Sequence, residues 1–287
     1  MPCPDRLSDI HTLQVIPGYL CNLKCAHCGT NSGPAAAGGL TEDEILRVEE
    51  AVRTIAPANL LFTGGEPTLY TDTVNRVVAA HPHLGDCSVQ ITTNGWFARS
   101  RSSMATILGR FQKLDRIQLS HDRHHGATSP ADLAGPLKAW CDERGLHFNV
   151  SVSITTPEDM LFADSVQRET GANVIFTRVE NAGRAKQERV AFPFQRFERK
   201  VEDAVCPNRG VLSYICGKGF SICCANLTFN NVGKFHHATA REHLQSEFYR
   251  EMAEERLGSM ARKRGIDAGA FLPEHSSPCG YCERLHA

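Results

Sequence analysis

The stretch 20-LCNLKCAHCG-29 carries three cysteines within eight positions, Cys21, Cys25 and Cys28. It directly follows an apolar run, residues 13–16, that is typical of a β-strand. Three thiolates on one loop can bind one corner of an iron–sulfur cube and leave the fourth iron without a protein ligand. A structural zinc ion would need a fourth ligand nearby, and His27 lies between two of the thiols, where simultaneous coordination is awkward.

Short β-branched runs alternate with longer segments of helical period on the C-terminal side of this loop. The expected strands are residues 13–16, 60–63, 89–92, 116–119, 147–154 and 173–177. The expected helices include residues 41–55, 71–80, 130–144 and 157–170. Thr41 and Glu44 have the spacing of a capping box, which favours a helix start there.

About six strand–helix units predict a parallel sheet with right-handed crossovers. Six units are too few for the eight of a closed barrel, so we expect an α/β fold, a partial (β/α)6 barrel that ends near residue 185. Parallel strands place their carboxyl ends at one edge of the sheet, where active sites collect. The polar residues that follow each strand should therefore line the active site.

The pattern changes after residue 185. Residues 211–226 are typical of a hairpin that turns at 217–219, a mixed-charge helix is expected over about 240–264, and a tail rich in Pro, Ser and Cys follows, with Cys279 and Cys282 in a loop. We expect two domains, residues 1–185 and 186–287. The second is a small extension of the first, and its small core makes a bound metal plausible.

The composition narrows the class of protein. The formal net charge of -1 gives no reason to expect nucleic acid or an anionic membrane as the principal partner. The N-terminal residues lack the apolar run of a secretory signal, and no apolar stretch is long enough to span a membrane, so we expect a cytoplasmic protein. Twelve cysteines in a reducing compartment indicate metal or redox chemistry rather than disulfides. Cys87 and Cys141 are expected to be packed as hydrophobic residues, and Cys3 is too isolated to interpret.

The spacing of Cys21, Cys25 and Cys28 is C-x3-C-x2-C, and it resembles the signature of the radical S-adenosylmethionine (SAM) superfamily. In that family the signature lies in the loop after the first barrel strand. The resemblance implies that the three thiolates hold a 4Fe-4S cluster whose open iron binds SAM. His27 occupies the place before the third cysteine, where the family usually has an aromatic residue near the SAM adenine.

The sequence Gly64-Gly65-Glu66-Pro67 follows the second strand and resembles the family's GGEP motif. The two glycines let the backbone approach a ligand closely. Glu66 or its neighbouring carbonyl groups can accept a hydrogen bond from the methionyl ammonium of SAM. The position of the motif, about forty residues after the cysteines at the end of a strand, strengthens the resemblance.

Polar residues after the third, fourth and sixth strands also resemble positions that line the SAM pocket. Asn94 follows the third strand, although Asn-Gly is also typical of an ordinary turn. Ser120 and Asp122 are candidates for the SAM carboxylate or the ribose hydroxyls, and Arg178 can grip the carboxylate with two hydrogen bonds or be a solvated loop residue. The histidines beside Asp122 are His121, His124 and His125, and we assign no metal to them.

A second group of cysteines follows the barrel: Cys206, Cys216, Cys223, Cys224, Cys279 and Cys282. The pattern Cys206, Gly219, Cys224, Cys279 and Cys282 resembles the twitch form of the SPASM extension. In radical SAM enzymes with that extension the four cysteines bind an auxiliary 4Fe-4S cluster. Cys223 can replace Cys224 as a ligand, and zinc is the alternative occupant of a four-thiolate site.

Cys216 and Cys223 are the spare thiols of this pattern. An S–H group can donate a hydrogen atom to a carbon radical, so both are candidate catalytic residues, with a structural cysteine as the alternative. Such a donor would give epimerisation, whereas an auxiliary cluster that accepts an electron would give dehydrogenation.

The resemblance implies reductive cleavage of SAM to a 5'-deoxyadenosyl radical, which abstracts a hydrogen atom from the substrate. We expect a small polar natural product of the aminocyclitol or sugar type. The alternative is a ribosomal peptide, whose maturases often carry a leader-binding domain before the barrel, where only about a dozen residues lie here. A flavodoxin or ferredoxin would supply the electron. The other classes are a non-catalytic iron–sulfur carrier and a binding module stabilised by zinc. SAM cleavage by the reduced protein would exclude the carrier, and stoichiometric zinc would support the binding module.

Overall fold

A computed structural model describes residues 6–126 and 131–287. Its centre is one eight-stranded sheet in the order β6-β5-β4-β3-β2-β1-β7-β8. The strands are β1 (Thr12–Ile16), β2 (Asn59–Phe62), β3 (Ser88–Thr93), β4 (Arg116–Ser120), β5 (His147–Ile154), β6 (Asn173–Arg178), β7 (Val211–Ile215) and β8 (Gly219–Ser221). Strands β1 to β6 run parallel, so all six expected strands are confirmed to within a residue at each end.

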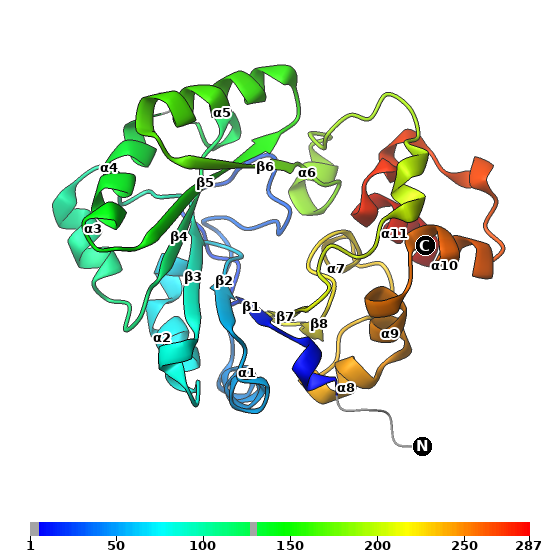
Figure 1. The fold of residues 1–287 in the computed structure, drawn as a ribbon, viewed down its shortest axis with the longest axis horizontal. Helices are drawn as coiled ribbons and strands as arrows, with labels where there is room; N and C mark the ends of the chain where they lie inside the picture. Colours follow the sequence, from blue (N-terminus) through cyan, green and yellow to red (C-terminus); the bar gives the residue numbers. More distant parts are fainter. Residues whose placement is uncertain (1–5, 127–130) are drawn as a thin grey trace.

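Helices cover the outer side of this curved, open sheet, and the C-terminal extension faces its open side (Figure 1). The covering helices are α1 (Glu42–Ile55), α2 (Thr71–Ala79), α3 (Arg101–Leu108), α4 (Ala131–Asp142) and α5 (Pro157–Thr170). The capping box of Thr41 and Glu44 begins α1 as expected. The expected start of the fourth helix, Pro130, lies outside the described residues. The fold is therefore the partial α/β barrel that the sequence predicts.

The extension continues the same sheet. Strand β7 pairs in parallel with β1, from Thr12 opposite Val211 to Ile16 opposite Ile215. Strands β7 and β8 form the expected antiparallel hairpin. The expected domain boundary at residue 185 falls inside the short helix α6 (Gly183–Gln187). Both edges of β1 are thus occupied, one by the barrel and one by the extension.

The expected single helix over residues 240–264 is wrong. Three helices occupy this segment: α8 (Ala240–Gln245), α9 (Glu247–Glu254) and α10 (Leu257–Lys263). Ser246 has an extended backbone, with ψ of 153°, and its hydroxyl accepts a hydrogen bond from the backbone N–H of Tyr249. Serine competes with helix continuation in this way, and the same residue then begins the next helix as its N-cap.

The last cysteines lie on a helix rather than in the expected loop. Helix α11 (Pro278–His286) begins after Ser277, whose hydroxyl accepts a hydrogen bond from the backbone N–H of Gly280. Pro278 takes the first helical position, where its missing N–H costs nothing. Cys279 and Cys282 are three residues apart, so they share one face of α11. A short helix, α7 (Asn226–Phe229), packs against that helix.

The described residues include no helix that is long and apolar enough to cross a membrane.

Candidate active site

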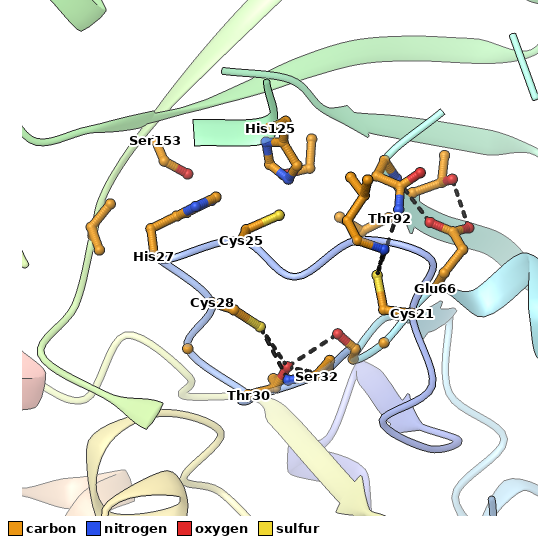
Figure 2. Close-up of a pocket in the computed structure, with 18 of the residues that line it drawn as sticks. Cys21, Cys25, His27, Cys28, Thr30, Ser32, Glu66, Thr92, His125 and Ser153 are labelled. Carbon is orange, nitrogen blue, oxygen red and sulfur yellow. Dashed lines mark hydrogen bonds between the residues drawn. The ribbon is translucent and has the colours of Figure 1, made fainter. Parts of the chain in front are cut away.

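The three signature cysteines lie on the loop that leaves the carboxyl end of β1. The neck of the loop is closed by two hydrogen bonds, from Cys21 N to Gly33 O (3.2 Å) and from Gly33 N to Tyr19 O (3.0 Å). The three thiols line a cavity of about 300 Å³ at the carboxyl ends of the strands. Figure 2 shows them on one loop, with Glu66, His125 and Ser153 among the residues around them.

Hydrogen-bond donors are already aimed at the sulfur atoms. The backbone N–H of Leu23 donates to Cys21 Sγ (3.4 Å), and that of Ser32 donates to Cys28 Sγ (3.3 Å). The side-chain amide of Asn94 lies 3.6 Å from Cys21 Sγ. Donors to sulfur stabilise thiolates and are among the features that tune iron–sulfur sites. The chemistry of this donor set therefore fits a cluster held by three thiolates.

The glycines of the GGEP sequence bring its loop against the cysteine loop. Gly65 N donates to Gly18 O (3.0 Å), and Glu66 N donates to Leu20 O (2.9 Å). A Cβ atom on Gly65 would collide with the carbonyl oxygen of Leu20. Gly64 has φ of +114°, which favours glycine. Both glycines also line the cavity, and Gly65 holds its loop against the backbone of the cysteine loop.

The carboxylate of Glu66 is buried and accepts hydrogen bonds from protein donors. Its Oε1 accepts from the hydroxyls of Thr93 (2.7 Å) and Thr68 (2.8 Å), and its Oε2 accepts from the backbone N–H of Asn94 (2.9 Å). Burial raises the pKa of Glu66. The carboxylate thus ties the loops after β2 and β3 together. The neighbouring carbonyl groups remain the candidates for the methionyl ammonium.

Most residues that the sequence predicts for SAM binding meet at one cavity. Those that line it with the cysteines are His27, Gly64, Gly65, Glu66, Asn94, Ser120 and Arg178. Pro67 is buried at the start of a short 3-10 helix, and Asp122 is fully buried. Neither of these two lines the cavity.

Asp122 is hydrogen-bonded to its neighbours in this structure, and its role toward the SAM carboxylate or the ribose stays a prediction. Its Oδ1 accepts from His125 Nδ1 (2.8 Å), and its Oδ2 accepts from Ser153 N (3.3 Å) and lies 3.5 Å from His27 Nε2. Burial alone would raise the pKa of Asp122, but His125 and His27 hold it well below its usual range. Burial alone would lower the pKa of His125, but the hydrogen bonds with Asp122 and Cys25 raise it to about 10.

His27 lies close to Asp122 and His125, and one of its ring nitrogens has no hydrogen-bond partner among the described residues. Burial lowers the pKa of His27 to about 4, so its ring is neutral at pH 7. Its Nδ1 is buried and has no hydrogen-bond partner among the described residues. His27, Asp122 and His125 also bring three potential metal-binding atoms within 4.8 Å of one another. His27 lines the cavity, where the resemblance implies the SAM adenine.

Five cysteines surround a second, enclosed cavity in the extension: Cys206, Cys223, Cys224, Cys279 and Cys282. Its other walls are mostly apolar and include Leu227, Phe248 and Met252. Burial raises the pKa of Cys206 to about 12 and those of Cys279 and Cys282 well above the ordinary value. These thiols are therefore protonated at pH 7 until a metal displaces their protons.

The two candidate hydrogen-atom donors do not line the first cavity. Cys223 belongs to the second group. Cys216 follows β7, where its N–H donates to Ile16 O (3.1 Å) and its carbonyl accepts from the hydroxyl of Tyr19 (2.9 Å). Cys87 and Cys141 are buried in the core as expected, and Cys3 lies outside the described residues.

Sequence reasoning missed two residues of the site, Ser153 and Glu180. Ser153 and Glu180 line the first cavity, and Arg184 binds the cysteine loop. Ser153 and Glu180 lie at the ends of β5 and β6, so the rule that polar residues after parallel strands form the site pointed to them. Burial raises the pKa of Glu180, which accepts a hydrogen bond from the hydroxyl of Ser277 (2.7 Å).

Comparison with known proteins agrees with the resemblance over part of the chain. Residues 15–125 match the family model described as the radical SAM superfamily. This part of the chain is therefore similar to a radical SAM domain. Its match to a GTP 3',8-cyclase of Lactiplantibacillus plantarum is 33% identical over 152 residues, which are 50% of this chain and 44% of that relative. The chain thus spans less than half the length of this curated relative.

Solved structures with radical SAM domains share the fold over almost the whole chain. The structure of anSMEcpe with bound AdoMet (SAM) and Cp18Cys peptide has a TM-score of 0.57 at 14% identity, and covers 96% of this chain and 97% of that one. The structure of BtrN with AdoMet and 2-DOIA has a TM-score of 0.52 at 12% identity, and covers 88% and 89%. The likeness therefore extends beyond the radical SAM domain into the extension.

Proposed function

We propose that the chain binds a 4Fe-4S cluster through Cys21, Cys25 and Cys28 and uses it to cleave SAM reductively. The single observation that carries the proposal is the loop of three thiols on one cavity, with donors aimed at the sulfurs. When bound, the cluster supplies the electron that splits SAM into methionine and a 5'-deoxyadenosyl radical, which removes a hydrogen atom from the substrate. The protein's residues hold SAM and exclude other donors. A flavodoxin or ferredoxin would deliver the electron.

We also propose an auxiliary 4Fe-4S cluster in the extension. The candidate ligands are Cys206, Cys224, Cys279 and Cys282, with Cys223 as the alternative to Cys224. Asn208 Nδ2 donates to Cys224 Sγ (2.9 Å), which supports Cys224 because cluster ligands accept such bonds. An electron acceptor in this place fits dehydrogenation of the substrate.

A cleft beside β6 is the proposed route of the substrate. It has a volume of about 810 Å³, and apolar residues such as Met160, Phe176 and Phe192 line it. Arg178 and Glu180 line both this cleft and the SAM cavity, so the two spaces meet at these residues. The guanidinium of Arg178 lies 5.1 Å from the ring centre of Phe192, which holds it beside the cleft. A substrate in the cleft would meet one anionic and one cationic side chain at its inner end.

The first candidate substrate is a small polar natural product of the aminocyclitol or sugar type. The carboxyl group of Glu180 suits an amine, and Arg178 suits an electron-rich oxygen. The reaction would be dehydrogenation or epimerisation, and no thiol lines the SAM cavity except those of the three cluster cysteines, so dehydrogenation has the better support among the described residues.

The second candidate is a peptide, because β6 is the last strand of the sheet. Its Phe176 is 49% exposed and lines the cleft. An end strand presents unpaired N–H and C=O groups, and an extended peptide can pair with them. Modification of a peptide side chain that enters the cleft is therefore the alternative function.

Iron and sulfide content, measured anaerobically with Mössbauer spectra, tests the proposal. We expect about eight irons in the wild type and about four in a Cys21→Ala, Cys25→Ala, Cys28→Ala variant, following two clusters of four irons each. The matched control is Cys87→Ala, a buried cysteine outside both sites, which should keep all the iron. The reduced wild type should also release 5'-deoxyadenosine from SAM, and the triple variant should not. Stoichiometric zinc, or iron without SAM cleavage, would contradict the proposed function.

A further inference from the structure

Arg184 binds the cysteine loop and is not among the residues that line the cavity. Its Nη1 donates to Cys25 O (2.9 Å) and its Nη2 donates to Ser32 O (2.7 Å). Its backbone N–H donates to Cys28 O (2.9 Å). The residue is only 8% exposed. One arginine therefore joins three points of the loop that carries the thiols.

The neighbouring residues fix this contact. Gly183 has φ of +56°, and a Cβ atom there would collide with the carbonyl oxygen of Gly29. Only glycine lets the start of α6 come so close to the loop. Asn230 accepts from Gly183 N (3.2 Å) and donates to Asn181 O (2.8 Å). The arginine is thus held in one position by the packing of the backbone on both sides.

The charge of Arg184 is not neutralised by a protein carboxylate. Its side chain donates to carbonyl oxygens, and no Asp or Glu oxygen lies within 4.0 Å of it among the described parts of the chain. A guanidinium stays protonated in proteins. A positive charge that is buried and unpaired acts over a longer range than one in water, because solvent screens it less.

We infer that Arg184 is a positioning residue that raises the reduction potential of the cluster at Cys21, Cys25 and Cys28. The inference rests on the proposed function, since it requires that cluster. Uptake of an electron adds a negative charge to a group that three thiolates already make negative. A fixed positive charge at the loop stabilises the reduced form more than the oxidised form, so the cluster accepts an electron from a weaker reductant. The hydrogen bonds of the same side chain keep the thiols in place.

The test is a redox titration of the full-length protein. The readout is the EPR signal of the reduced cluster that SAM perturbs. Arg184→Gln removes the charge and keeps a donor, and Arg184→Lys keeps the charge and loses the paired donors. We expect the Gln variant to lower the reduced fraction about tenfold or more at a fixed potential, which corresponds to about 59 mV for one electron. The Lys variant should remain close to the wild type. Lys24→Gln is the matched control, because Lys24 lies in the same loop but is exposed.

The outcomes separate this inference from the proposed function. A wild type that binds no cluster would contradict the proposed function. A Gln variant that loads four irons at the first site and keeps the wild-type potential would overturn the inference and leave the proposed function standing. If the Gln variant loads no cluster, the Lys variant decides. A wild-type potential in the Lys variant supports the role of the charge. A lowered potential or a failure to load overturns the inference, because the hydrogen bonds and not the charge then matter.

Discussion

Gly65 illustrates how one missing side chain sets the geometry of the site. Its backbone lies against Leu20 in the cysteine loop, where a Cβ atom would collide with a backbone carbonyl that cannot rotate away. Gly65→Ala should therefore displace the cysteine loop and reduce the iron retained at the first site to less than half. Iron content and the midpoint of thermal unfolding measure this effect. Gly85→Ala is the control, because a Cβ atom there meets nothing within 4 Å, and a similar iron loss in both variants would refute the explanation.

Residues close in the sequence could be predicted for the site, and residues brought together by the fold could not. Cys21, Cys25 and Cys28 share one loop, so their spacing alone indicated a common ligand. Arg184 binds the carbonyl of Cys25 across 159 positions, a contact without local pattern. Asp122 was expected to face SAM, but its carboxylate accepts hydrogen bonds from the backbone N–H of His124 and the ring of His125 on its own loop. The chemistry of the residues was readable, and the direction of each side chain was not.

At the scale of elements, Asp159 holds the turn between β5 and α5, which borders the proposed substrate cleft. Its buried carboxylate accepts from Thr155 N (2.7 Å) and Thr156 N (2.8 Å) and pairs with Arg123 Nε (2.8 Å). Burial alone would raise the pKa of Asp159, but these donors lower it to about 2. A carboxyl group whose pKa is lower in the folded state than in the unfolded state stabilises the fold at pH values above its unfolded pKa of about 3.9. This stabilisation is lost as the pH falls through the pKa of the folded state.

Asp159→Asn should therefore reduce the free energy of unfolding by about 2 kcal/mol at pH 7. The difference in the free energy of unfolding between the variant and the wild type should shrink as the pH falls from about 4 toward 2. In that range the Asp159 carboxyl group becomes protonated in both the folded and the unfolded state. Urea unfolding at several pH values measures it. Asp164→Asn, on the exposed face of α5, is the control and should change stability by less than about 0.5 kcal/mol. A difference that stays constant with pH would contradict the assignment.

Regular elements of the barrel were predictable because each has a clear period of apolar residues. Helix α5 has the expected bounds, and β5 likewise. The segment after residue 240 has the composition of one helix, yet Ser246 uses its side chain to end one helix and begin the next. Helix α11 was missed for the opposite reason, since its Pro and Gly are typical of a loop but sit in the first turn, where a helix accepts them.

At the scale of the whole molecule, the sheet depends on the extension. A chain that ends at residue 185 would lose β7 and expose the edge of β1, whose Leu13, Val15 and Ile16 are at most 1% exposed. An uncovered apolar edge strand associates with other chains. We therefore expect this truncated chain to aggregate in size-exclusion chromatography. A chain that ends at residue 277 keeps the hairpin, and it should remain monodisperse while it binds about four irons fewer. A monodisperse 1–185 chain would show that the two expected domains fold independently.

The pairing of β7 along β1 also limits how relatives of this protein can diverge. A loop such as residues 188–198 can gain or lose residues at low cost, since loop closure depends only weakly on length. A single insertion within β7 has a different result, because a shift of one residue turns every side chain to the opposite face of the sheet. Cys223 and Cys224 follow this hairpin directly, so the shift would carry the thiols out of the second cavity. Lineages that keep both cysteine groups are therefore expected to preserve the length of the hairpin even where its sequence drifts.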